Sequence, residues 1–284
     1  FLNGNPVLEY HETATFQVVM LLEDGFWRVR HFVRVASEPV KVKKEPKISA
    51  VDKEAFRNIK GLNYYPKDSP WDTFGNRFHD SIISADFRTI RDMGFNTVRI
   101  FIPYMDFGAA QVNQDRLAKV RALLDIAGKQ NIKVVITLFD FYGDYSVPNW
   151  TATFTHAEKM VTALKDHSSL LAWDLKNEPD LDFEARGKED VLGWLRELCL
   201  RINKWDGLHP VTVGWSSPEA AVNMAKEVDF VSFHYYREIQ DFMPSYQKLQ
   251  NAIPKDKITL LQEYGKSSYS GMWNAFLNSE EKQA

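Results

Sequence analysis

Short apolar runs and amphipathic stretches alternate along most of the chain. From about residue 48 onward, runs with the length of a buried strand are separated by segments whose apolar residues recur at helical spacing. The clearest helical stripe consists of Leu117, Val120, Leu123, Leu124 and Ala127. Such alternation predicts parallel strands joined by helices.

The strand-like runs number seven. They lie at residues 59–65, 96–102, 134–139, 170–177, 211–215, 230–236 and 258–265. An open doubly wound sheet is the alternative, but no glycine-rich phosphate turn follows the first run. The prediction is therefore an α/β fold, a (β/α)8 TIM barrel that lacks its eighth strand in this chain. Two of its helices are predicted to begin at the capping box Thr155–Glu158 and at Ser217-Pro218.

The first part of the chain has a different pattern. Residues 14–22 and 26–35 are rich in β-formers and flank Asp24-Gly25, which predicts a β-hairpin. The charged, proline-flanked stretch 37–46 is typical of a linker. We therefore predict a β-rich segment and linker over residues 1–47 and a barrel domain, incomplete at its C-terminal end, over residues 48–284.

Composition excludes several classes of function. The hydrophobic fraction of 44% and the charged fraction of 26% are those of an ordinary globular protein, and the net charge of −3 gives no reason to expect nucleic acid as a partner. No run of 18 apolar residues is present, so we expect no membrane span. The lone cysteine, Cys199, forms no intrachain disulfide.

Two predicted strands end in a glutamate. One run stops at Asn177-Glu178-Pro179, and another ends at Glu263. Polar residues at an ordinary strand exit would explain either glutamate alone. In a barrel, however, the carboxyl ends of the strands form the active-site face. A pair of carboxyl groups there is what cleavage of a glycosidic bond requires.

Matches on four strands, in order, identify a known pattern. Arg99 lies in a Val-Arg-Ile-Phe run, Asn177 precedes Glu178, His234 and Tyr236 form a His-x-Tyr, and Glu263 ends the seventh run. The sequence resembles the retaining (β/α)8 glycoside hydrolases of the cellulase and β-mannanase superfamily (clan A). The context Trp-Asp-Leu-x-Asn-Glu-Pro is similar to that of β-mannanases.

This resemblance implies a role for each residue. Glu178 would be the general acid/base and Glu263 the nucleophile, and the neighbouring carboxylate favours the protonated form of Glu178. Asn177 would bind the 2-hydroxyl of the sugar. Tyr236 would donate to Glu263.

The resemblance leaves other positions open. Arg99 would hold Glu263 ionised, and a buried pair between Arg99 and Asp174 is an equally weighted, compatible alternative. His234 would bind substrate or orient a carboxylate, unless it is simply a core histidine. Asp140 stands at the third-strand exit, where many relatives carry histidine, and we count it among the substrate-binding residues.

Aromatic side chains are plentiful, at 13% of the chain, and rings near strand exits are candidates for stacking on sugars. Trp215 and Trp150 are the first choices, with Trp71, Tyr65, Tyr142 and Tyr145 as further candidates. The other histidines show no ligand spacing, so we predict no metal and no cofactor.

The predicted function is hydrolysis of a β-linked glycan of the β-glucan or β-mannan class by double displacement. The alternatives are a carbohydrate-binding pseudoenzyme or assembly domain, and a transglycosylase that uses the same two glutamates. The expected partner is an oligo- or polysaccharide, and the oligomeric state is not predicted. The chain starts at Phe1 and shows no signal peptide, so the expected location, secreted, periplasmic or at the cell surface, rests on the substrate class alone.

Overall fold

A computed structural model describes residues 8–10, 14–23, 26–35, 47–48 and 50–265. The chain forms two compact units, Phe1–Glu45 and Pro46–Ala284. The linker predicted at 37–46 and the predicted turn and terminal segment after Gly265 lie outside the described residues.

The first unit contains a three-stranded antiparallel sheet in the order β1-β2-β3. Its strands are β1 (Leu8–Tyr10), β2 (Ala14–Glu23) and β3 (Phe26–Val35). The predicted hairpin is confirmed for the β2–β3 pair, although its turn residues Asp24 and Gly25 lie outside the described residues. The short strand β1 was not predicted.

The second unit is built on seven parallel strands in the order β10-β9-β8-β7-β6-β5-β4. These strands are β4 (Gly61–Asn63), β5 (Thr97–Pro103), β6 (Lys133–Asp140), β7 (Leu170–Asn177), β8 (Val211–Trp215), β9 (Val231–Tyr235) and β10 (Thr259–Tyr264). Cα atoms of the two edge strands, β4 and β10, approach within 8 Å of each other. The seven described strands therefore form a nearly closed barrel, and the predicted α/β barrel without its eighth strand is confirmed.

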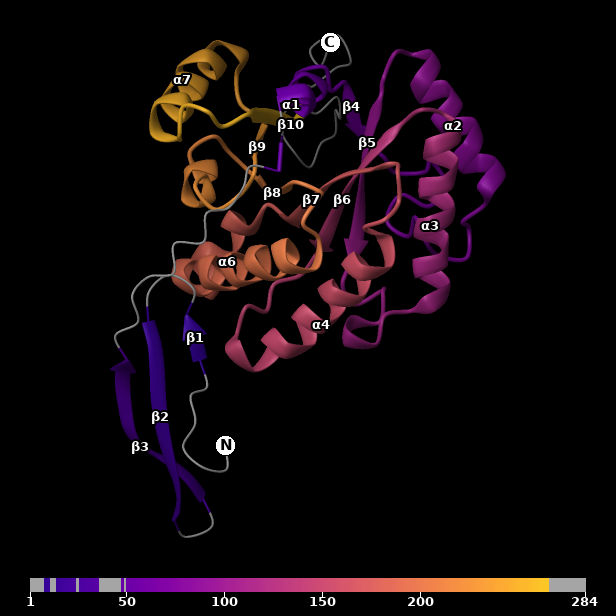
Figure 1. Ribbon diagram of the computed structural model, residues 1–284. Helices are drawn as coiled ribbons and strands as arrows, with labels where there is room; N and C mark the ends of the chain where they lie inside the picture. Colours follow the sequence, from indigo (N-terminus) through magenta and orange to yellow (C-terminus); the bar gives the residue numbers. More distant parts are fainter. Residues whose placement is uncertain (1–7, 11–13, 24–25, 36–46, 49, 266–284) are drawn as a thin grey trace, which may run out of the picture. The chain divides into compact units, whose positions relative to one another are not determined.

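The helices lie outside the strands, as Figure 1 shows for α2, α3, α4 and α6. Their bounds are α1 (Ala50–Arg57), α2 (Asp80–Asp92), α3 (Gln114–Lys129), α4 (Val147–Leu164), α5 (Phe183–Arg186), α6 (Lys188–Trp205) and α7 (Phe242–Ala252). In the described part of the chain, 3-10 turns lie at Ala109–Gln111, Pro179–Asp182, Ala220–Met224 and Ile239–Asp241. No helix in the described part of the chain is long and apolar enough to cross a membrane.

Burial explains the continuous apolar runs of the sequence. Strands β5, β6 and β7 are buried along almost their whole length because one face lies inside the barrel and the other lies under helices. The predicted stripe of α3 is buried in the same core. At its start, the side chain of Asn113 accepts a hydrogen bond from the backbone N–H of Arg116 (3.1 Å) and caps the helix.

Two predicted helix starts are wrong. Helix α4 begins at Val147, with a proline in its first turn, so the predicted capping box at Thr155 lies inside the helix. Ser217 and Pro218 precede only the 3-10 turn Ala220–Met224. In both places a local capping signal was present, but tertiary packing determined where and how far the helix extends.

Candidate active site

Glu178 and Glu263 lie close together at the carboxyl ends of β7 and β10. One oxygen of each carboxyl group and one ring nitrogen of His234 are all within 4.8 Å of one another. The side chains of Glu178 and Glu263 are 24% and 11% exposed, so both are largely shielded from water.

The backbone at Glu178 has an unusual conformation. Its φ of 45° and ψ of 53° are in the left-handed region, which costs a non-glycine residue about 1–2 kcal/mol. Its N–H donates to the carbonyl of Gly214 on β8 (2.7 Å). In a regular strand Asn177 and Glu178 would point to opposite faces, whereas this turn brings both to the same site.

His234 lies between the two carboxyl groups. Its Nδ1 is 2.8 Å from Oε1 of Glu178 and 3.4 Å from Oε2 of Glu263, and its side chain is 0% exposed. The hydroxyl of Tyr236 donates to Oε2 of Glu263 (2.8 Å) from the end of β9. His234 therefore contacts both carboxylates, and Tyr236 contacts one.

The same site has the geometry of a possible metal site. In the described part of the chain, ligand atoms close enough together to bind a metal ion come from Glu178, His234 and Glu263. Their carboxylate oxygens already accept hydrogen bonds or ion pairs from His234, Tyr236 and Arg99. These partners satisfy the carboxylates without a cation. The absence of a metal stays a prediction.

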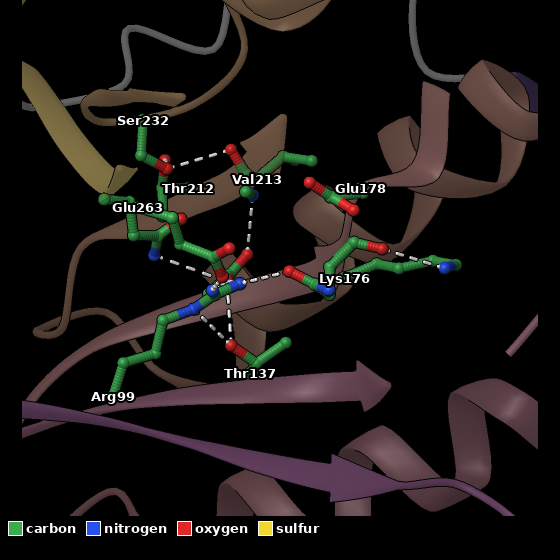
Figure 2. A network of polar contacts seen from close by, with 12 residues as sticks. Arg99, Thr137, Lys176, Glu178, Thr212, Val213, Ser232 and Glu263 are labelled. Atoms are coloured by element: carbon green, nitrogen blue, oxygen red, sulfur yellow. Dashed lines mark hydrogen bonds and ion pairs between the residues drawn. The ribbon is translucent and has the colours of Figure 1, made fainter. Parts of the chain in front are cut away.

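Arg99 on β5 connects four strands (Figure 2). Its Nη1 forms an ion pair with Oε1 of Glu263, and its Nη2 donates to Oδ2 of Asp174 (2.6 Å) and Oδ1 of Asn177 (3.0 Å). Its Nε donates to Oγ1 of Thr137 (2.8 Å) on β6. The two alternatives for Arg99, a pair with Glu263 and a pair with Asp174, are present together.

Gly214 provides the space for this network. A Cβ atom at this position would lie 2.7 Å from Nη2 of Arg99 and 2.8 Å from Oε1 of Gln262. The backbone N–H of Gly214 also donates to Oδ1 of Asp174 (2.8 Å). A side chain at residue 214 would therefore displace the arginine.

These contacts determine the charge state of Glu263. Burial raises the pKa of its carboxyl group, but the charges of Arg99 and His234 and two side-chain hydrogen bonds outweigh burial and hold that pKa below its ordinary value. The hydrogen bonds come from Tyr236 and from Asn63 at the end of β4. The carboxyl group of Glu263 is thus held in its charged form.

The amide of Asn177 has a defined orientation. Because its Oδ1 accepts from Arg99, its NH2 group is the part left to donate to a ligand.

Asp140 ends β6 and is 5% exposed. Burial raises the pKa of its carboxyl group to about 6, against the lowering effect of the Arg99 and Lys176 charges. The ammonium group of Lys176 is itself buried and lies 3.6 Å from Oδ2 of Asp182. The third-strand exit therefore holds a buried carboxylate with two cations nearby.

Trp215 and Trp150, the first choices for stacking on a sugar, do not present an open ring face at a strand exit. Trp215 is 1% exposed and packs against Phe183 in the core, so neither face of its ring is open. Trp150 lies on α4 instead of at a strand exit, packs against Phe154, and donates its indole N–H to the carbonyl of Tyr145 (2.8 Å). Trp150 was misplaced because the sequence pattern did not show that α4 starts before it, whereas Trp215 ends β8 as predicted but is buried.

Sequence reasoning missed four residues that contact the site. They are Asn63, Thr137, Gly214 and Gln262. A polar residue inside the first strand-like run, residues 59–65, was the available signal for Asn63. Thr137 and Gly214 carry no signal of their own, because their importance depends on the register between strands.

Comparison with known proteins agrees with this fold. The family model "Cellulase (glycosyl hydrolase family 5)" matches residues 51–283. Two mannan endo-1,4-β-mannosidases from Solanum lycopersicum are similar to this chain. Number 5 is 26% identical over 178 residues, covering 48% of this chain and 42% of the relative. Number 1 is 36% identical over 101 residues, covering 30% of this chain and 25% of the relative. The matched part thus spans less than half of each relative.

Solved structures show the same architecture. The exo-β-1,4-mannosidase Op5Man5 from Opitutaceae bacterium strain TAV5 superposes with a TM-score of 0.65 at 20% identity, over 76% of this chain and 46% of that protein. A β-glucuronidase from Bacteroides uniformis superposes with a TM-score of 0.61 at 18% identity, over 79% of this chain and 27% of that protein. At these identities the likeness concerns the fold.

Proposed function

The chain belongs to the cellulase family, glycosyl hydrolase family 5, and we propose that it hydrolyses β-linked glycans with retention of configuration at the anomeric carbon. The observation that carries the proposal is the short separation of Glu178 and Glu263, whose carboxylate oxygens lie within 4.8 Å. Retaining enzymes hold their two carboxyl groups about 5–5.5 Å apart, whereas inverting enzymes need about 6.5–9.5 Å to admit a water molecule.

In this proposal Glu263 is the nucleophile. The ion pair with Arg99 and the hydrogen bond from Tyr236 favour its charged form and orient its oxygens. Its carboxylate attacks the anomeric carbon, and the bond to the leaving-group oxygen breaks as a glycosyl ester forms. Attack by a carboxylate that is already charged and held in place requires no proton transfer from the nucleophile.

Glu178 is the proposed general acid/base. It gives its proton to the leaving oxygen and then, once Glu263 has been converted to a neutral ester, takes a proton from the water that attacks the same carbon. His234 touches both carboxyl groups, so we assign it the positioning of the pair.

The remaining proposed roles concern substrate. The NH2 group of Asn177, held by Arg99, donates to the 2-hydroxyl of the sugar, a contact that strengthens in the transition state. Asp140 accepts hydrogen bonds from sugar hydroxyls at the third-strand exit. Because the named relatives are mannan endo-1,4-β-mannosidases, β-1,4-mannan is the substrate to test first, followed by β-1,4-glucan. Such polymers lie outside the cytoplasm, and we propose that the protein acts there.

The test is turnover of these polymers by the wild type, Glu263→Gln and Glu178→Gln, followed by NMR assignment of the first-formed anomer. We expect loss of about four or more orders of magnitude in kcat for Glu263→Gln. Glu158→Gln, an exposed glutamate on α4, is the matched control and should keep wild-type activity. An inverted product, or full activity in Glu263→Gln, would refute the assignment. Transfer products would indicate a transglycosylase, and binding without turnover a carbohydrate-binding module.

A further inference from the structure

Strand β7 contains one extra residue near its carboxyl end. Asp174 pairs with Thr212 on β8. Three residues later Asn177 pairs with Gly214, which is only two residues further along β8, so β7 carries one residue more than its neighbour. Bulges of this kind re-aim side chains and are frequent beside active sites. This one brings Asp174 and Asn177 to the same face, where both accept hydrogen bonds from Arg99.

Lys176 lies inside this bulge and is almost fully buried. It is 5% exposed, and burial lowers the pKa of its ammonium group against the opposing effect of the Asp182 and Asp140 charges. A charged side chain in the interior needs partners that replace its hydration, and an apolar side chain of similar length would avoid that cost. A lysine at this position therefore calls for an explanation other than packing.

The partners of Lys176 lie on both sides of Glu178 in the chain. Its Nζ donates to the carbonyl oxygen of Asn177 (3.0 Å), which belongs to the peptide group that leads into Glu178 (Figure 2). The orientation of this planar group sets φ of Glu178, so the hydrogen bond restrains the left-handed conformation directly. The same Nζ lies 3.6 Å from Oδ2 of Asp182, at the end of the 3-10 turn that follows Glu178.

The turn after Glu178 is also anchored to two neighbouring loops. Oδ2 of Asp182 accepts the hydroxyl of Tyr145, from the loop after β6. Asp180 accepts the backbone N–H of Ser216 (3.0 Å), directly after β8, and the hydroxyl of the same serine. A strained residue persists only where its surroundings over-determine it, and these anchors do so for Glu178.

We propose that Lys176 is a positioning residue for the general acid/base, which fixes the turn that presents the carboxyl group of Glu178 to the leaving-group oxygen. This inference rests on the proposed function. Proton transfer requires the acid within hydrogen-bond reach of that oxygen, and a displacement of about 1 Å can cost about 100-fold in rate. Without Lys176 the peptide group before Glu178 is free to rotate, whereas the contacts that hold Glu263 stay in place.

The experiment varies the leaving group of the substrate. Lys176→Met keeps a side chain of similar length and removes the donor. A dinitrophenolate departs without a proton, whereas a phenolate leaves readily only when an acid protonates it. We therefore compare kcat/KM for 2,4-dinitrophenyl and phenyl β-mannobioside. In Lys176→Met we expect the value for the phenyl substrate to fall about 10- to 100-fold, and that for the dinitrophenyl substrate clearly less.

Lys119→Met is the matched control, because Lys119 also pairs with an aspartate (Asp115, 2.6 Å) and donates to a backbone carbonyl (Gly75, 3.0 Å). It should keep the wild-type ratio of the two kcat/KM values. Equal losses for both substrates in Lys176→Met would overturn the proposal, since lost stability or an altered charge at Asp140 affects both alike. If Lys176→Met does not fold, Asp182→Asn, which keeps its shape, should change the ratio in the same direction.

A crystal structure of Lys176→Met separates failure of this inference from failure of the proposed function. We expect Glu178 to leave the left-handed region, and its Oε1 to move away from Nδ1 of His234, which lies 2.8 Å from it in the wild type. An unchanged turn would overturn the proposal. If the wild type turns over no glycan, the proposed function fails, and this structure still decides whether Lys176 positions Glu178.

Discussion

Nη2 of Arg99 lies 2.6 Å from Oδ2 of Asp174, and the two side chains are only 4% and 0% exposed. The pair is therefore out of water, and the partners must replace the hydration that both charges lose on folding. Oδ1 of Asp174 also accepts the backbone N–H of Gly214 (2.8 Å). One carboxylate thus holds β5, β7 and β8 in register below the two glutamates.

Asp174→Asn should be strongly destabilising. The variant leaves the buried Arg99 with the ion pair to Glu263 but without its charge partner on β7, and removal of one partner of a buried pair costs about 3–5 kcal/mol in the free energy of unfolding. Urea denaturation measures this cost. The matched control is Asp92→Asn, whose ion pair with Arg91 is at the surface, where a pair contributes about 0–1 kcal/mol. Equal losses in the two variants would contradict the role given to Asp174.

Tyr236→Phe should change the pH dependence of catalysis. The phenol donates to Glu263 and favours its charged form, so the variant raises the pKa of Glu263. The proposed attack by Glu263 requires the charged form, which is present above that pKa, so the acidic limb of kcat/KM should move to higher pH. Tyr246→Phe loses a phenol that bonds Thr259 instead and should leave the profile in place. An unmoved acidic limb in Tyr236→Phe would show that the hydrogen bond does not influence the charge of Glu263.

Gly214→Ala should reduce catalytic activity through a steric clash with Arg99. The new methyl group would lie 2.7 Å from Nη2 of Arg99, and the arginine would carry its displacement to Glu263. Because misplacement by about 1 Å can cost about 100-fold in rate, we expect kcat/KM to fall about 10- to 100-fold. Gly207→Ala is the control, since nothing lies within 4 Å of a Cβ there. If the two variants have equal activity, the packing argument fails.

His156 should make stability dependent on pH. Its side chain is 0% exposed, its Nδ1 is 2.8 Å from the carbonyl oxygen of Ala109, and its Nε2 has no partner among the described residues. Burial lowers the pKa of the ring to about 4. In the unfolded chain that pKa is about 6.5, so between these values the unfolded state binds the extra proton. Stability should therefore fall as pH drops through this window, by on the order of 3 kcal/mol.

His156→Gln, which does not titrate, tests this relation. Its free energy of unfolding should vary less between pH 6.5 and pH 4 than that of the wild type, because the buried imidazole that gains a proton on unfolding is absent. Urea denaturation across this pH range gives the slopes. A wild-type slope in His156→Gln would rule out this histidine as the cause.

The sequence was most informative about the regular alternation of strands and helices. Buried strands alternate with amphipathic helices, so the barrel, its strand order and the strand ends bearing Glu178 and Glu263 could be predicted. The proximity of those two glutamates followed from the shared rim of a parallel barrel. Their chemical roles stay proposals.

Features that depend on register could not be predicted. Thr137 lies beside Arg99 because the pairing of β5 with β6 puts it there, and no local pattern reports that pairing. The start of α4 was misplaced because the capping box at Thr155 was taken as the helix start, and Trp150 was misplaced with it.

The left-handed backbone of Glu178 has a consequence for how such a barrel changes over evolutionary time. Glycine at this position would release the strain of a φ of 45°, whereas any substitution of Arg99 would leave buried carboxylates unpaired. Substitution of Glu178 should thus cost little stability, whereas substitution of Arg99 should cost much. A lineage released from selection for turnover would lose Glu178 first and keep a folded barrel. Non-catalytic descendants should therefore carry a substituted residue 178 beside an intact Arg99 and Asp174.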